Sequence, residues 1–200
     1  MAEIRVLGRG PVLAALLLTV VGSSAMFTVF TYIAPILQRE AAASTTFVTA
    51  MLVLFGVGLT LGNVWGGKAA DRSVDRTLIV SLATLIAVLL VFPLLLGWSL
   101  PTALAILVWG AASFALVPPL QMRVMEAAKD APNLASAVNI GAFNLGNAIG
   151  AALGGAVINA GLGYPAIALA GAATAALGLL MVLMFAWRGR GQALTGRAAA

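Results

Sequence analysis

The sequence contains no cysteine and no histidine. Without cysteine there can be no disulfide and no thiolate chemistry. Without histidine there is no Ser–His pair of the kind an intramembrane serine protease uses, and metal hydrolases lose one of their main ligands. Charge is also scarce, because Asp, Glu, Lys and Arg make up 8% of the chain where about a quarter is usual. We therefore expect no enzyme, no catalytic residue, no metal site and no cofactor.

Apolar residues instead make up 62% of the 200 residues. A soluble domain of this size buries only part of its surface, so it could not remove that much apolar side chain from water. The composition predicts an all-α membrane protein whose main partner is the lipid bilayer. The net charge of +5 does not indicate nucleic-acid binding, because no basic face interleaved with aromatic residues accompanies it.

The stretches without charge set the number of spans. No charged residue occurs in 10–38, 41–67, 77–122 or 131–187. A spanning helix needs about 20 apolar residues, so the first two stretches hold one helix each. The last two hold two each, because the turn-like sequences GWSLP and NAGLGYP divide them. We predict one transmembrane domain over residues 1–200, with a cytoplasmic tail at 188–200 and six spans near 12–36, 44–66, 78–97, 101–122, 134–159 and 164–187.

Basic residues predict the orientation of these spans. Lysine and arginine are enriched in cytoplasmic loops. Six spans place Arg39 on one side of the membrane and every other lysine and arginine on the opposite side. Both termini are therefore predicted to be cytoplasmic. Arginine outnumbers lysine nine to two, and alanine and glycine are abundant, which is typical of a GC-rich bacterial genome. We expect a multi-pass protein of a bacterial inner membrane.

Two predicted spans carry glycine at every fourth residue. The second has Gly58, Gly62 and Gly66, and the fifth has Gly146, Gly150 and Gly154. Residues four apart share one face of a helix, and a stripe of glycine lets a second backbone approach closely. Each stripe lies in the middle helix of a group of three. The chain therefore fits two three-helix repeats of inverted topology.

Few polar residues lie within the spans. Ser24, Thr28, Thr31 and Tyr32 share one face of the first span, which Pro35 is expected to kink. Trp109 and Ser113 are one turn apart in the fourth. These residues either line a cavity or serve only structure, with hydroxyl groups bonded back to their own helix. In the fifth span, Asn139, Asn144 and Asn147 accompany the glycines and can bond neighbouring helices together.

Several sequence stretches resemble one transporter family. The loop GNVWGGKAADRSVDRT at 62–77 holds a glycine, three residues and then Asp-Arg, followed by more basic residues. This pattern resembles the loop motif of the major facilitator superfamily. FTYIAPIL at 30–37, PPLQ at 118–121 and the Asn/Gly-rich stretch at 136–158 are similar to its arabinose-efflux-permease-like group of drug and sugar exporters. The likeness covers nearly the whole chain, but only the C-terminal six of that family's twelve helices.

The resemblance implies roles for particular residues. It assigns Gly67, Asp71, Arg72 and Arg76 to a loop that steadies one state of the transport cycle. Where the family pattern usually has glycine and arginine, this chain has Val74 and Asp75. A purely topological role of these charges is the alternative.

The resemblance also implies how the spans are used. The first and fourth helices line the substrate path in the family, which makes Ser24, Thr28, Tyr32, Trp109 and Ser113 the candidates here. The second and fifth helices face the other six-helix half. We therefore expect the two glycine stripes to offer close-packing surfaces to a partner outside this sequence.

These observations lead to a main hypothesis and an alternative. The chain is expected to be the C-terminal half of an exporter that works by alternating access with an N-terminal half or a second copy of itself. The substrate would be a small molecule, and polar side chains in an apolar path suit sugars and amphiphilic drugs equally. If the protein is a proton antiporter, the titrating residue must lie outside these spans, since none of them contains Asp, Glu, Lys, Arg or His. The alternative is a non-transporting membrane subunit or a truncated, inactive fragment.

Overall fold

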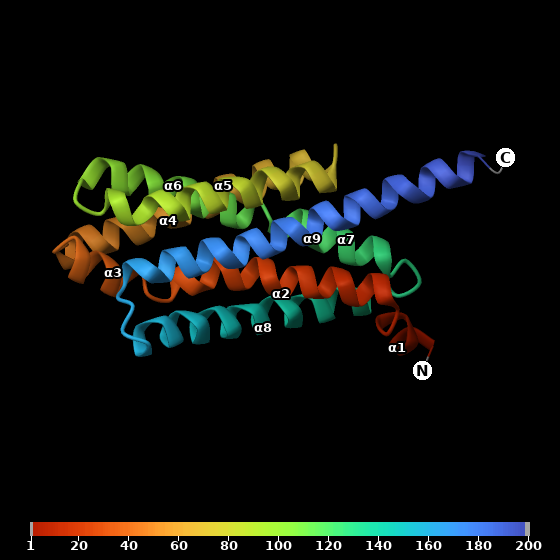
Figure 1. Ribbon diagram of the computed structural model, residues 1–200, viewed down its shortest axis with the longest axis horizontal. Helices are drawn as coiled ribbons and strands as arrows, with labels where there is room; N and C mark the ends of the chain where they lie inside the picture. The colour runs from red at the N-terminus through yellow and green to blue at the C-terminus, as the bar shows by residue number, and fades with distance from the viewer. Residues whose placement is uncertain (1, 199–200) are drawn as a thin grey trace.

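The protein is all α-helical. The computed structural model describes the backbone of residues 2–198 and the side chains of residues 5–187. The helices of the described chain run along a common long axis (Figure 1). In chain order they are α1 (Ala2–Leu7), α2 (Gly10–Phe30), α3 (Ile33–Glu40), α4 (Thr45–Ala70), α5 (Val74–Leu95), α6 (Ser99–Phe114), α7 (Val117–Ala127), α8 (Pro132–Asn159) and α9 (Pro165–Ala198).

The expected six spans are confirmed. Within residues 2–198, six helical segments are long and apolar enough to cross a membrane. The first consists of α2 and α3 together, and the fourth consists of α6 and α7 together. The others are α4, α5, α8 and the part of α9 that ends at Trp187.

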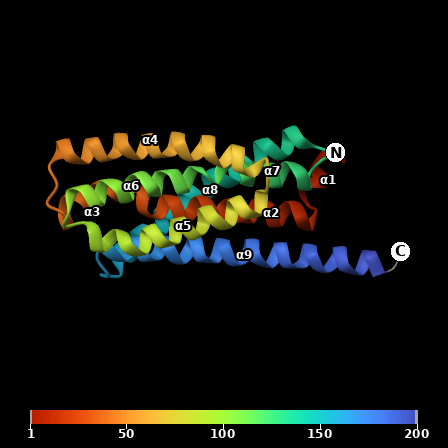
Figure 2. The same cartoon turned by 90° about the horizontal axis from the view of Figure 1, so that it is seen from above.

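The loops alternate between the two ends of the bundle. Figures 1 and 2 show α1, the α4–α5 loop, the α7–α8 loop and the end of α9 at one end, and the α3–α4, α5–α6 and α8–α9 loops at the opposite end. We call the first of these the basic end, because it carries Arg5, Arg9, Lys68, Arg72, Arg76, Arg123 and Lys129. The helix α9 continues to Ala198, while the side chains of the predicted tail at 188–200 lie outside the described residues.

Proline interrupts two of the spans. The first breaks at Thr31 and Tyr32, four residues before Pro35, rather than at the proline itself as predicted. Pro35 has no N–H to donate to the carbonyl of Thr31, and its ring crowds that carbonyl. The same effect of Pro119 accounts for a break that the sequence did not lead us to expect, at Ala115 and Leu116 between α6 and α7.

The packing repeats in the two halves of the chain. The first span, through α2, packs against α8 and α9, and the fourth, through α6, packs against α4 and α5. Exchanging the first three spans with the last three converts one of these sets of contacts into the other. The same exchange converts another extensive contact, that of α5 with α9, into itself. This pattern is that of two inverted three-helix repeats.

Glycine permits the closest contacts of both repeats. A Cβ added to Gly58 would lie 2.5 Å from the carbonyl oxygen of Leu107 on α6, and one added to Gly150 would lie 2.5 Å from that of Ser24 on α2. Both are closer than real Cβ atoms approach, so only glycine fits. The expectation that the stripes face a partner outside this sequence is therefore wrong. Both stripes pack within the chain, and the opposite faces of α4 and α8 are the exposed ones.

Candidate functional site

The charged loop at the basic end is short and capped. The helix α4 ends at Ala70, and α5 begins at Val74, where the Ser73 hydroxyl accepts a hydrogen bond from the Arg76 N–H at 3.3 Å. Asp71 and Arg72 are exposed, and within the described side chains neither forms an ion pair. Gly67 lies one turn before the loop, and a Cβ added there would meet no atom within 4 Å.

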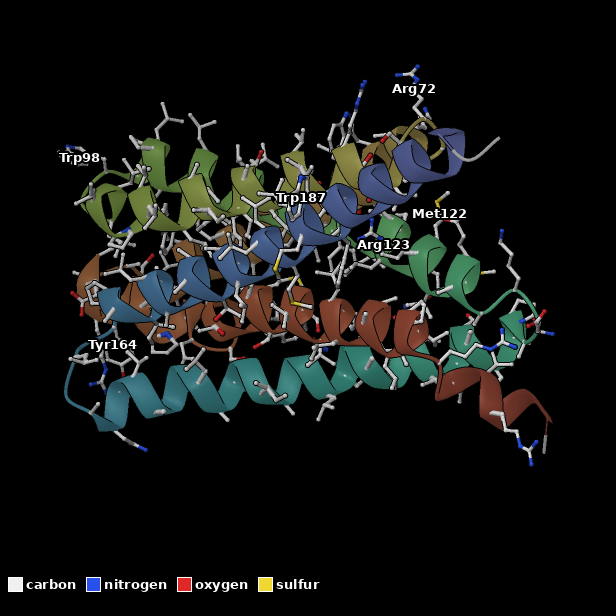
Figure 3. All side chains as sticks on the ribbon, turned by 45° about the vertical axis from the view of Figure 1, so that its right-hand side comes forward. Arg72, Trp98, Met122, Arg123, Tyr164 and Trp187 are labelled. Carbon is white, nitrogen blue, oxygen red and sulfur yellow. The ribbon has the colours of Figure 1, made fainter. Side chains whose placement is uncertain are left out.

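The ion pair of this region is formed by Asp75, one of the two residues that depart from the family pattern. Asp75 lies in the first turn of α5 and pairs with Arg123 of α7. The Arg123 side chain is 17% exposed, and its guanidinium carbon lies 5.9 Å from the ring centroid of Phe185 on α9. Figure 3 shows Arg123 between α7 and α9, whereas Arg72 projects outward. One arginine therefore joins three helices.

A chain of hydrogen bonds between side chains links α2, α7 and α8. Thr19 of α2 donates to the side-chain oxygen of Asn139 on α8 at 2.7 Å. The Asn139 amide donates to the Gln121 side-chain oxygen on α7 at 2.6 Å, and the Gln121 amide donates to the Ser136 hydroxyl at 2.7 Å. Thr19 and Asn139 are buried. Because buried polar groups are costly without partners, this chain fixes how the first, fourth and fifth spans meet.

The polar face of the first span packs against the glycine stripe of α8. Ser24 and Thr28 are buried there, with Gly150 beside the backbone of both residues. Thr28 donates back to the Ser24 carbonyl at 2.8 Å. Tyr32 is half-buried and donates to the Ala151 carbonyl at 2.8 Å. The structure thus brings these three candidates together, at a helix contact rather than beside a wide cavity.

The candidates on α6 lie deeper in the bundle. Trp109 and Ser113 are buried, and the Trp109 ring packs between Phe55 at 4.5 Å and Phe92 at 6.2 Å, centroid to centroid. The indole N–H of Trp109 and the hydroxyls of Ser113 and Ser24 have no hydrogen-bond partner within the described residues. Unpartnered buried polar atoms are rare in folded proteins and call for an explanation.

Aromatic rings form a continuous row through these candidates. Neighbouring ring centroids lie 4.5–6.2 Å apart, within the range of favourable aromatic contacts. In spatial order the row is Phe143, Phe27, Phe30, Phe55, Trp109 and Phe92. It crosses from α8 through α2, α4 and α6 to α5, so each of the first five spans supplies at least one ring.

Sequence reasoning missed two parts of this arrangement. Arg123 was counted only as a topological charge, although a lone arginine at the end of a span and an acidic residue at the start of another were visible signals. The phenylalanines were missed because they are scattered along the chain. Their one signal was that Phe27 and Phe30 flank the polar residue Thr28.

The exposed faces of α4 and α8 carry amides as well as apolar side chains. In their most apolar stretches, 28% of the residues of α4 and 22% of those of α8 are buried, against 61% in the first span. Asn63 of α4 and Asn144 of α8 are exposed on these faces, within the predicted spans. An amide that faces hydrocarbon without a hydrogen-bond partner costs several kcal/mol. These faces are therefore poorly suited to lipid.

Comparison with known proteins gives a consistent result. The family model described as "Major Facilitator Superfamily" matches residues 15–199. The chain is 58% identical over 184 residues to "Inner membrane transport protein YdhP" of Escherichia coli K12, with 92% of this chain and 47% of that protein covered. It is 35% identical over 170 residues to the "Uncharacterized MFS-type transporter YfhI" of Bacillus subtilis, covering 85% of this chain and 43% of that protein.

A third relative carries a name that includes a substrate class. The chain is 32% identical to the "Probable sugar efflux transporter" of Mannheimia succiniciproducens over 182 residues, which cover 90% of this chain and 46% of that protein. The chain therefore spans about half the length of each of these relatives.

Proposed function

Because the chain belongs to the major facilitator superfamily, a family of membrane transporters rather than enzymes, we propose that it is the C-terminal half of a small-molecule exporter. In this proposal it works by alternating access together with an N-terminal six-helix half or with a second copy. The relatives support this reading, because each is about twice as long as the part it shares with this chain.

The exposed amides of α4 and α8 carry the proposal of a partner half. Asn63 and Asn144 lie on the two helices that the family turns toward its other half. A water-filled path or a helix of the partner would supply the hydrogen bonds that lipid lacks. The same faces are the least buried of the bundle, so a partner would cover the surface that the chain itself leaves open.

The substrate path of the proposal follows the aromatic row. Ser24, Trp109 and Ser113 hold polar atoms that are buried and unpartnered in this conformation. Ser24, Thr28 and Tyr32 all lie at the contact of α2 and its extension with α8, so in this proposal they reach the substrate in a state of the cycle that loosens this contact. Hydroxyl and indole donors beside aromatic rings suit a sugar, as in the relative named a probable sugar efflux transporter, or an amphiphilic drug.

The loop would act as a latch through a different acid from the one the family motif highlights. Asp75 and Arg123 tie the start of α5 to the end of α7, and Phe185 of α9 packs on the arginine. Any motion that moves the fourth span relative to the third at the basic end must break this pair. Gly67, Asp71, Arg72 and Arg76 would then set the shape and charge of the turn.

The proposed location is the inner membrane of a bacterium. YdhP, the relative with 58% identity, is named as an inner membrane transport protein. Because basic residues gather at one end of the bundle, that end and both termini are proposed to face the cytoplasm.

A transport assay with and without a partner tests the proposal. The chain would be expressed alone and together with the part of YdhP that it does not cover, and export of radiolabelled L-arabinose and of ethidium measured from loaded cells. We expect export above background only from the pair, and a loss of export when Trp109→Ala is introduced. Equal export by the chain alone would overturn the need for an N-terminal half. An export-inactive pair that still assembles would favour a non-transporting subunit or an inactive fragment.

A further inference from the structure

A hollow opens between α4 and α5 at the basic end of the bundle. Its volume is about 270 Å³, and its lining includes Trp65 of α4, Arg72 and Ser73 of the loop, and Arg76 and Val80 of α5. Both arginines are exposed, and the two acids of the loop, Asp71 and Asp75, are not among its lining residues. Two guanidinium groups therefore line the hollow, and none of the described carboxylates does.

A second hollow continues from the first toward the middle of the span. It has a volume of about 190 Å³ and shares Trp65 and Val80 with the first, while α6 contributes the floor through residues such as Ala111. Its walls are almost wholly apolar. Ser81 also lines it, is 1% exposed, and has a hydroxyl without a hydrogen-bond partner within the described residues.

The two hollows together form one groove, which is basic at one end and apolar at the other. A phospholipid likewise has a charged head group and apolar acyl chains. At the basic end, two guanidinium groups can hold a phosphate. Trp65, with 49% of its surface exposed, lies where tryptophan marks the membrane–water interface. Ser81 lies one helical turn, about 5.4 Å, beyond Thr77 of the first hollow, where an ester carbonyl of the glycerol backbone would accept its hydroxyl hydrogen. The apolar hollow beyond matches an acyl chain.

We propose that this groove, formed by α4, α5 and α6, is a binding site for one anionic phospholipid. Arg72 and Arg76 bind the phosphate, and the acyl chain lies along Val80 in the apolar hollow. Basic pockets between transmembrane helices are suited to such head groups. The site requires a bilayer and not a transport cycle, so it stands apart from the function proposed above.

Native mass spectrometry of the purified chain tests this site. Dioleoyl phosphatidylglycerol and dioleoyl phosphatidylcholine would be titrated separately, and the dissociation constant of the first bound lipid measured. We expect one phosphatidylglycerol to bind more tightly than phosphatidylcholine. The double variant Arg72→Gln/Arg76→Gln should weaken phosphatidylglycerol binding roughly 10- to 30-fold, because each basic residue contributes about 1 kcal/mol to such binding.

Two further variants separate this site from general surface charge. Lys68→Gln/Lys129→Gln removes the same charge at the same end but outside the groove, and its dissociation constant should stay within about twofold of the unmodified chain. Val80→Trp fills the groove without changing its charge and should also abolish the tight binding of phosphatidylglycerol. The helical circular dichroism spectrum should stay unchanged. Equal weakening by the two double variants would overturn the proposal, as would tight binding that survives Val80→Trp. If Val80→Trp abolishes assembly with a co-expressed partner half but leaves lipid binding intact, the groove is a protein interface and the proposal is overturned too.

Discussion

At the scale of single residues, the fold depends on glycines, which have no side chain, as much as on the side chains of other residues. Gly150 lies so close to the backbone of α2 that a Cβ would be 2.5 Å from the Ser24 carbonyl oxygen. Gly141, on the exposed side of the same helix, has no atom within 4 Å of the corresponding position. Two glycines of one helix therefore differ only in what faces them.

Alanine substitution at these two glycines is expected to have opposite effects. Alanine favours a helix by about 1 kcal/mol over glycine, so Gly141→Ala should be neutral or stabilising. Gly150→Ala should lower the free energy of unfolding by about 1–3 kcal/mol, because α2 and α8 must separate to admit the methyl group. Thermal unfolding in detergent, followed by circular dichroism, measures both. Equal midpoints for the two variants would contradict the close contact of α2 and α8.

The ion pair of Asp75 and Arg123 is a second single-residue test. Asp75→Asn removes the ion-pair partner of the mostly buried Arg123 guanidinium, which then keeps only the more distant charge of Glu126. Because Asp75 is itself partly exposed, we expect a loss of about 1–2 kcal/mol, below the 3–5 kcal/mol of a fully buried pair. Asp71→Asn, an exposed acid of the same loop, should change the unfolding midpoint little.

Exchange of the two charges completes this test. The variant Asp75→Arg/Arg123→Asp should recover part of the stability that Asp75→Asn loses, since it restores an opposite-charge pair at the same place. The coupling energy between positions 75 and 123 follows from this double variant and its two single variants. A value near zero would show that the ion pair contributes nothing to stability and would remove the proposed latch.

At the scale of helices, the sequence predicted which segments exist better than how they meet. Stretches without charge predicted the spans, because a charged side chain in hydrocarbon is costly enough to mark their ends. The position of the break before Pro35 depends on a hydrogen bond four residues earlier, and the break at Ala115 follows the same rule. The partner of Asp75 was not predictable, because it depends on how closely α7 approaches α5. Glycine spacing predicted close contacts but could not tell whether they lie within the chain.

The hydrogen-bond chain between α2, α7 and α8 gives the prediction for this scale. Asn139→Ala leaves the side-chain oxygen of Gln121 without its donor, and it leaves the Thr19 hydroxyl with only the longer bond to the Ala15 carbonyl at 3.3 Å. We expect a loss of about 2 kcal/mol in the free energy of unfolding. Asn144→Ala, an exposed amide five residues along the same helix, should leave stability unchanged. A smaller effect of Asn139→Ala than of Asn144→Ala would mean that the buried chain does not hold the three helices together.

At the scale of the whole molecule, the distribution of charge predicts one orientation. Fusion of green fluorescent protein after Ala200 should give fluorescent cells, and fusion of alkaline phosphatase at the same point should be inactive. Fusions after Gly97, in the loop between α5 and α6, should give the reverse result. Active phosphatase after Ala200 would contradict the orientation that places both termini in the cytoplasm.

The proposed function requires that the exposed faces of α4 and α8 meet a second transporter half rather than lipid. Because the chain has no cysteine, single cysteines can carry a spin label at chosen positions without background. Leu94 of α5 and Leu177 of α9 are exposed apolar residues and serve as lipid-facing controls for Asn144.

Spin-label accessibility in membranes shows whether these faces meet protein or lipid. With the chain co-expressed with the part of YdhP that it does not cover, labels at 94, 144 and 177 would be compared for collisions with oxygen, which concentrates in lipid, and with a water-soluble nickel complex. We expect low oxygen accessibility at 144 and lipid-like values at 94 and 177. A label at 144 that is as accessible to oxygen as the two controls would contradict this expectation.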